Sequence, residues 1–250
     1  MQEYVNEEAQ NLIDSGQIRI EDIGNNKESY LPLMENICSK MINALRRRSV
    51  TGIYVAFNTE DLDKRSQNDF IPTLYIRDLD PDSLPPEKNT DLLMERSPVE
   101  LVKFTGISTD KGWKSLSVSA ESTEKFIYPV FQKAFKDQGS LRAADYGHWT
   151  TENYTLDGDD RSAIAYSIPL ILDDGTVYGV LGVEMLTEYL NIQMPYEELQ
   201  NQSAGTYMLA YTKSSLKDEE IVLENICGVS SKSSSMEQWR WDSCFPSPDM

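Results

Sequence analysis

The stretch DYGHWTTENYTLDGDDRSAIAYSIPLILDDGTVYGVLGVEMLTEYL at residues 145–190 decides the fold of this chain. Three runs in it have the composition of strands, at residues 146–156, 163–172 and 176–185. The last two flank Asp174 and Gly175, a pair that favours a tight hairpin turn because both turn positions need a positive φ. The sequence therefore predicts an antiparallel hairpin between the second and third runs.

Pairing within this hairpin sorts its side chains onto two faces. One face is bulky and apolar and is expected in a core. It carries Ile164, Tyr166, Ile168 and Leu170 opposite Met185, Val183, Leu181 and Gly179. The other, small face carries Ala165, Ser167 and Pro169 opposite Glu184, Gly182 and Val180. A bulge or an edge at Pro169, which cannot donate a backbone hydrogen bond, would shift this register by one residue.

The small face admits two interpretations. Small side chains either let a helix pack closely or leave room for a ligand. Glu184 favours the ligand, because a carboxylate pressed under a helix would need a partner. Trp149 lies on the strand that precedes the hairpin and is expected to close the same cavity. The predicted ligand contacts are Glu184 and Trp149, with Tyr154, Arg77, Tyr75 and Ser167 as further candidates.

The order of these motifs resembles the distal half of a double Cache (dCache) domain, a PAS-like extracytoplasmic sensor module. The resemblance rests on a strand with a tryptophan, then AIAYSIPL, a DG turn, YGVLGVEML and TEYL. TGIYVAFNT at residues 51–59 and TLYIRDLDP at residues 73–81 resemble its opening strands. The resemblance covers roughly residues 28–213. It implies an α+β fold, in which a long N-terminal helix packs on a PAS-like antiparallel sheet and a second, smaller PAS-like unit begins.

The resemblance also bears on the ligand. In amino-acid-sensing members of the family, an arginine-x-tryptophan-tyrosine run grips the ligand carboxylate, and a later acidic residue takes the ammonium. Here the corresponding run, Asp145 to Trp149, keeps the tryptophan and lacks the arginine, while Glu184 matches the acidic position. The resemblance therefore does not imply that an α-amino acid is the ligand of this chain. A cationic or amine-bearing ligand that faces Glu184 under Trp149 is expected, with an anion at Arg77 as the alternative.

Hydrophobic periodicity predicts the remaining elements. Helices are expected at residues 1–14, 29–48 and 122–137, and strands at 51–59, 73–79, 113–118, 204–212 and 221–228. Residues 87–112 are expected to form a short helix and a loop. Ser29 is expected to cap the second helix, with Pro32 in its first turn. The apolar stripe of that helix is expected to pack on the sheet. It consists of Leu33, Ile37, Met41 and Leu45.

These elements, together with the family resemblance, imply four parts of the chain. They are an N-terminal helical segment at 1–48, a membrane-distal PAS-like ligand-binding subdomain at 49–194, a partial membrane-proximal subdomain at 195–229 and a tail at 230–250. The tail has no helix or strand period and is expected to be disordered or truncated.

Charge and composition exclude several classes of protein. The net charge is −18, from 23 basic and 41 acidic residues, which argues against binding to nucleic acid or to anionic lipid. No run approaches the about 18 apolar residues of a membrane span, which taken alone indicates a soluble, cytoplasmic protein. The family resemblance implies instead a membrane helix in a flanking segment. The three cysteines form no CxxC pair, and neither zinc nor redox chemistry is expected. The net charge also opposes association, so a weak homodimer at most is expected.

Catalytic motifs are scarce. The one histidine is His148, and GxSxG, HExxH, GxGxxG and GxxxxGK[ST] are all missing, so no enzyme activity and no cofactor is expected. The aspartates at 78–82 and 157–160 lack the glycine and glutamate of a calcium loop, so plain turns are expected and no metal. The function expected from the resemblance is ligand sensing on the extracytoplasmic side of a bacterial membrane. A diguanylate cyclase or histidine kinase outside this segment would be the output. A free-standing solute-binding protein and a hydrolase remain alternatives.

Overall fold

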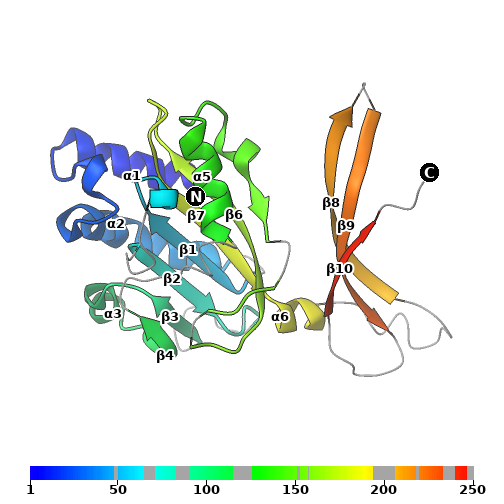
Figure 1. The fold of residues 1–250 in the computed structure, drawn as a ribbon. Coiled ribbons are helices and arrows are strands. Elements are labelled where there is room, and N and C mark those ends of the chain that lie inside the picture. Colours follow the sequence, from blue (N-terminus) through cyan, green and yellow to red (C-terminus); the bar gives the residue numbers. More distant parts are fainter. Residues whose placement is uncertain are drawn as a thin grey trace. The chain divides into compact units, whose positions relative to one another are not determined.

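The structure of this chain is a computed structural model. It describes residues 1–47, 50–64, 71–82, 91–114, 126–150, 153–156, 158–193, 206–217, 220–232 and 240–246. The chain divides into two compact units, which are described separately (Figure 1). The first contains Met1–Thr150 and Tyr154–Leu186, and the second contains Thr151–Asn153 and Thr187–Met250.

A seven-stranded sheet forms the centre of the first unit (Figure 1). Its strands are β1 (Gly52–Phe57), β2 (Thr73–Asp78), β3 (Leu92–Arg96), β4 (Ser108–Lys114), β5 (His148–Trp149), β6 (Ala163–Ile171) and β7 (Val177–Leu186). They lie in the order β4-β3-β2-β1-β7-β6-β5, and every neighbouring pair except β3 and β4 is antiparallel. The α+β class and the PAS-like antiparallel sheet predicted from the sequence are confirmed. The first strand, β1, lies between β2 and β7.

The hairpin of β6 and β7 has the predicted register. Ile164 pairs with Met185, and Leu170 pairs with Gly179. The register shifts only beyond Leu170, so Pro169 leaves the two faces as predicted. Gly175 has a φ of +88°, a conformation that glycine adopts without steric cost.

Helices α1 (Gln2–Asp14) and α2 (Lys27–Leu45) pack on one face of this sheet. The α2 stripe that the sequence singled out is fully buried, which confirms that prediction. It packs in one core with Ile53, Val55 and Phe57 of β1 and Leu74 and Ile76 of β2. The bulky hairpin face belongs to the same core through Leu170 and Leu181. Helix α5 (Tyr128–Lys136) packs against β6 and β7, and Phe126 just before it contacts the ring of Tyr54 of β1.

Several element boundaries differ from the prediction. Helix α2 begins at Lys27, because the side chain of Asn26 rather than that of Ser29 caps it by accepting from the backbone N–H of Glu28. Pro32 therefore lies beyond the first turn. In 87–112 the sequence missed β3, which precedes α3 (Val99–Thr105).

Two further predicted elements are shorter than expected. Of the strand expected at 146–156, the described residues form β5 and a bridge between Tyr154 and Ala163, because η4 (Ala143–Tyr146) takes the start; residues 151 and 152 lie outside the described residues. Helix α5 starts at Tyr128, and residues 122–125 of the helix expected there lie outside the described residues. Residues 115–118 of the strand expected at 113–118 also lie outside the described residues. The first two residues of that expected strand belong to β4. Two short 3-10 turns, η1 (Ile20–Asp22) and η2 (Leu62–Lys64), complete the first unit.

The second unit contains α6 (Thr187–Ile192) and an antiparallel sheet in the order β10-β9-β8. Strands β8 (Thr206–Lys217) and β9 (Glu220–Lys232) confirm the two strands expected at 204–212 and 221–228. Strand β10 (Arg240–Pro246) lies in the expected tail, where pairing with β9 supplies an order that the local sequence pattern lacks. The division between the units falls after Leu186, before the boundary expected at 194. Among the described residues, no helix combines the length and the apolar character that crossing a membrane requires.

Candidate functional site

The site is organised by a cross-strand row on the small face of the sheet. Gly52 of β1 pairs with Arg77 of β2 on one side and with Glu184 of β7 on the other. Gly52 has no side chain, so the two charged side chains meet over it. A Cβ atom at this position would lie 3.0 Å from the Cβ and Oε1 atoms of Glu184. The absence of a side chain in the middle strand therefore makes room for the pair.

Arg77 and Glu184 form a two-pronged ion pair whose side chains are both fully buried. Nε of Arg77 donates to Oε1 of Glu184 at 2.7 Å, and Nη2 donates to Oε2 at 2.7 Å. This fork geometry is the strongest arrangement available to an arginine and a carboxylate. Burial lowers the pKa of Arg77, but the charge of Glu184, the hydrogen bonds to it and the charge of Glu95 together outweigh burial, so the pKa lies above its ordinary value. Arg77 is therefore charged at every physiological pH.

Two tyrosines complete the surroundings of Glu184. The Tyr154 hydroxyl donates to Oε2 of Glu184 at 2.9 Å, and the Tyr75 hydroxyl donates to the same oxygen. The two hydroxyl oxygens lie 2.8 Å apart. Burial, and then the charge of Glu184, raise the pKa of both hydroxyls well above its ordinary value. Both tyrosines therefore keep their protons and act as donors.

A second row on the same face brings aromatic rings to the ion pair. Tyr54 pairs with Tyr75 on one side and with Gly182 on the other, and Gly182 pairs with Ser167. The ring of Tyr54 lies over Gly182, where a Cβ atom would be 2.2 Å from the Tyr54 hydroxyl oxygen. That hydroxyl lies 2.5 Å from Oγ of Ser167. The Tyr54 ring centroid lies 4.9 Å from that of Tyr75 and 5.0 Å from that of Phe126.

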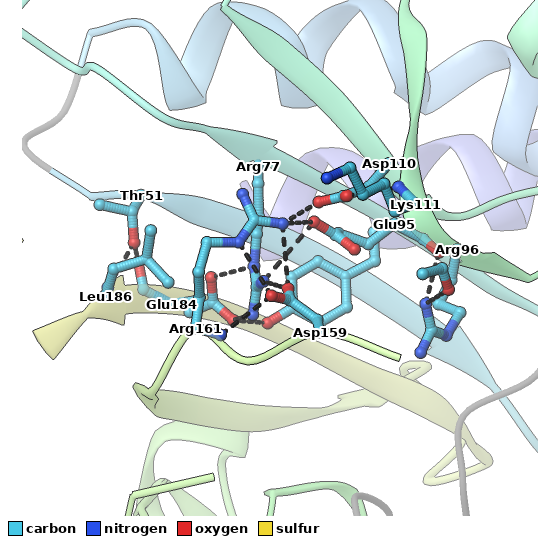
Figure 2. A network of polar contacts seen from close by, with 12 residues as sticks. Thr51, Arg77, Glu95, Arg96, Asp110, Lys111, Asp159, Arg161, Glu184 and Leu186 are labelled. Atoms are coloured by element: carbon cyan, nitrogen blue, oxygen red, sulfur yellow. Dashed lines mark hydrogen bonds and ion pairs between the residues drawn. The ribbon is translucent and has the colours of Figure 1, made fainter. Parts of the chain in front are cut away.

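The ion pair continues into a larger network (Figure 2). Nη1 of Arg77 donates to Asp159 and lies 3.5 Å from Oε1 of Glu95. Arg161 donates from Nε to Asp159 at 2.9 Å, and from Nη2 to Glu95 at 2.7 Å and to Asp110. Burial raises the pKa of Glu95, and the two arginines partly oppose that rise. The network ties β2, β3, β4 and β7 to the turn before β6.

Comparison with known proteins found similarity among solved structures. No protein-family model and no curated protein matches it. Among solved structures it is similar to the periplasmic sensory domain of the Campylobacter jejuni chemoreceptor Tlp1, at 11% identity and a TM-score of 0.40, over 83% of this chain and 61% of that chain. The chain thus spans less than two thirds of that domain.

Two more solved structures are similar to it. One is methyl-accepting chemotaxis protein X, at 12% identity and a TM-score of 0.35, over 76% of this chain and 72% of that chain. The other is the extracellular domain of mmHK1S-Z2, a protein assigned as a histidine kinase. It has 14% identity and a TM-score of 0.38, over 86% of this chain and 67% of that chain. These three neighbours are thus a periplasmic sensory domain, a chemotaxis protein and an extracellular domain. The double Cache module itself stays a prediction.

The structure brings together five of the six predicted site residues. Glu184, Arg77, Tyr75 and Tyr154 contact one another directly, and Ser167 joins them through Tyr54. The ligand contacts predicted for them stay predictions.

Trp149 is not part of this group, and the prediction that it faces the same cavity as Glu184 is wrong. In the two-residue strand β5, His148 pairs with Ser167 and Trp149 pairs with Tyr166. Successive side chains of a strand alternate between faces, so Trp149 lies on the face opposite to Glu184. Its ring contacts that of Tyr166 at 5.1 Å, and 46% of the residue is exposed.

Sequence reasoning missed Gly52 and Tyr54 as members of the site. The alternation in TGIYVAFNT was the available signal, because it places Gly52, Tyr54 and Ala56 on one face and the bulky apolar residues on the other. Glu95, Asp110 and Arg161 carry no comparable signal, since segments far apart in the chain bring them together.

Asp78, at the end of β2, forms a turn as predicted. Its Oδ1 accepts from the backbone N–H of Asp80 at 3.1 Å, the bond that defines an Asx turn. The residue is 4% exposed, and burial raises the pKa of its carboxyl from 3.8 to about 6; the Asp80 N–H and Arg46 oppose the rise, and the charges of Asp91 and Asp80 add to it.

We expect Asp78→Asn to stabilise the protein increasingly as the pH rises from about 4 to about 6. A carboxyl whose folded pKa is raised contributes its stability below its unfolded pKa and loses it as the pH rises through the folded value. The difference in unfolding free energy between variant and wild type, measured by urea titration, should therefore grow over this range and then stay constant. Asp137→Asn, at an exposed position, is the control. A difference independent of pH would contradict this expectation.

Proposed function

We propose that this chain is the ligand-binding part of an extracytoplasmic receptor, and that its ligand carries a positively charged amine. The observation that carries the proposal is Glu184, a fully buried carboxylate bordered by Tyr75 and Tyr154 and bound to Arg77. Carboxylates beside aromatic faces suit organic cations, because ring faces attract positive charge. Buried polar groups that converge inside an apolar surrounding are typical of small-molecule sites.

Arg77 marks the place that the ligand cation would take. Its guanidinium carbon lies 5.6 Å from the centroid of the Tyr75 ring while its nitrogens bind Glu184. An ammonium group of the ligand would bind the same carboxylate and the same ring. Arg77 has other partners in Asp159 and Glu95, so it keeps a counter-charge when it leaves Glu184. The exchange therefore buries no unpaired charge.

This exchange would also provide a signal. Arg77 and Gly52 lie on β2 and β1, and the opposite faces of those strands support α2. A ligand that binds better when Arg77 has turned away would shift the population between two arrangements of these strands. Helix α2 would then pass the change toward flanking membrane segments and an output domain. The sequence resemblance is the reason to propose a diguanylate cyclase or a histidine kinase as that output, on a receptor that dimerises weakly without its anchors.

A thermal-shift screen of amines, quaternary ammonium compounds, amino acids, carboxylates, purines and sugars tests this proposal. We expect stabilisation by amines, since a ligand at about 100 times its Kd adds about 2.7 kcal/mol to the unfolding free energy. Calorimetry should then show that Glu184→Gln weakens binding by about 2–4 kcal/mol, the usual effect of truncating one partner of a buried charge pair.

Glu35→Gln, on the exposed side of α2, removes the same charge and should bind as wild type does. Unchanged affinity in Glu184→Gln would place the ligand elsewhere. If the screen found an anionic ligand whose binding requires Arg77, the proposal that the ligand is positively charged would be wrong.

A further inference from the structure

We infer that Glu95, Asp110 and Asp159 form a binding site for a divalent cation, with calcium as the best fit. Each residue offers one carboxylate oxygen, and these oxygens lie within 4.8 Å of one another. They come from β3, from β4 and from the turn before β6. The site does not include Glu184, but it shares Glu95 and Asp159 with Arg77, the residue that the amine ligand proposed above would displace.

The spacing and the kind of ligand atom suit calcium. Oxygen ligands lie about 2.3–2.6 Å from a calcium ion, so two of them on one ion are separated by at most about 5 Å. Three carboxylates with water in the remaining positions match the irregular coordination that calcium accepts. Magnesium demands near-ideal octahedral geometry and usually takes only one or two carboxylates.

The charge of the network calls for a further cation. Among the described residues it holds four carboxylates, from Glu95, Asp110, Asp159 and Glu184, against the two guanidiniums of Arg77 and Arg161 that pair with them. The buried Arg96 donates from Nη1 to the backbone carbonyls of Glu95 and Gly112, and its charge also acts on Glu95 and Asp159, so one negative charge is in excess. Buried charges are costly unless they are paired. If Arg161 turned into solvent, the excess would become two negative charges, which a divalent cation would cancel.

Glu95 supplies a second, independent observation. The residue is fully buried, and its Oε2 has no hydrogen-bond partner in the described part of the chain. A buried carboxylate oxygen without a donor is rare and costs free energy. Figure 2 shows the carboxylates of Glu95 and Asp110 pointing toward the Arg161 guanidinium. An ion bound to the three acidic side chains would give Oε2 of Glu95 a positively charged partner, which the arginines beside Oε1 do not provide.

Arg161 holds the position that the cation would take. Its Nη2 contacts Glu95 at 2.7 Å, Asp159 at 3.0 Å and also Asp110. An Nη2 group has two protons, so it cannot bond to three acceptors at once, whereas one ion can. The Arg161 side chain is 24% exposed and can therefore turn into solvent. Calcium and the Arg161 guanidinium would thus compete for the same three oxygens.

Calorimetry with calcium chloride on EDTA-stripped, dialysed protein tests the inference, with terbium luminescence as a second readout. We expect one calcium site with a Kd of about 10⁻⁴–10⁻³ M, the range of extracellular calcium modules, and weaker binding of magnesium. Absence of both heat and terbium emission in the wild type would overturn the inference. The titration uses no organic ligand, so its outcome does not depend on the amine screen.

Two variants should change the affinity in opposite directions. Asp110→Asn should weaken calcium binding about tenfold or more, as loss of a metal-site partner does. Arg161→Gln should strengthen it several-fold, because the competitor is gone. Asp145→Asn and Arg142→Gln, which alter an exposed ion pair on η4 in the same way, should bind as the wild type does. If the two controls changed the affinity as much as Asp110→Asn and Arg161→Gln do, the binding would reflect general charge attraction and not this site. Weaker binding in Arg161→Gln would make the guanidinium a structural partner, and either result overturns the site.

Discussion

Replacing Arg77 by methionine is expected to lower the free energy of unfolding by about 3–5 kcal/mol, the usual cost of breaking a buried ion pair from one side. Glu184 would lose its counter-charge inside the sheet, and Asp159 would lose a donor. Methionine fills a similar volume, so the loss would report on charge rather than on a cavity. Urea unfolding at pH 7 in the presence of EDTA, followed by tryptophan fluorescence, measures it.

Glu184→Gln is the matched variant, and its cost should be clearly smaller. Removing this carboxylate leaves Arg77 with Asp159 and Glu95 as partners and reduces the negative excess of the network. The double variant should regain part of the stability that Arg77→Met loses, because it no longer buries the unpaired carboxylate of Glu184. An equal or larger loss in Glu184→Gln would show that the network lacks the charge imbalance described above.

Replacing Gly182 by valine is expected to cost about 3 kcal/mol or more through overpacking. The added Cβ atom would lie 2.2 Å from the Tyr54 hydroxyl oxygen, and the ring cannot move away because Tyr75 and Phe126 contact it. Moving the ring would also break its contact with Ser167. Thermal unfolding measures this loss, and the amine and calcium titrations show whether the site survives.

A double-mutant cycle with Tyr54→Ala separates the clash from a general intolerance of valine at this position. Tyr54→Ala removes a buried aromatic side chain and should itself cost about 3–5 kcal/mol. If the ring of Tyr54 is what valine meets, the two losses should be far from additive. Additive losses would place the cause in the backbone of β7 instead.

The hairpin could be predicted from sequence because everything that defines it is contiguous. Asp174 and Gly175 set the turn, and the alternation on either side sets the faces. The α2 stripe could be predicted for the same reason, since its spacing follows the helix period. Even the shared face of Ser167 and Glu184 followed from this local register.

The rest depends on which strands become neighbours, and no local pattern shows that. Arg77 meets Glu184 only because β1 inserts between their strands and offers Gly52 at the crossing point. The face of Trp149 was predicted wrongly because β5 is only two residues long. A shift of one residue in its pairing with β6 moves the side chain to the other face. Glu95, Asp110 and Arg161 converge across three separate segments, so their sequence positions predicted nothing about the network.

Gly52 has a consequence for folding. The ion pair above it joins residues that are 107 positions apart, and it forms only after β1 has paired on both sides. Contacts between such distant segments belong to the late steps of assembly. A sheet with the wrong strand order would bury Glu184 without its arginine, at a penalty of several kcal/mol. Because Gly52 leaves room for the ion pair, the native strand order gives Glu184 its counter-charge. A sheet with another strand order would be less stable by this penalty and would unfold again.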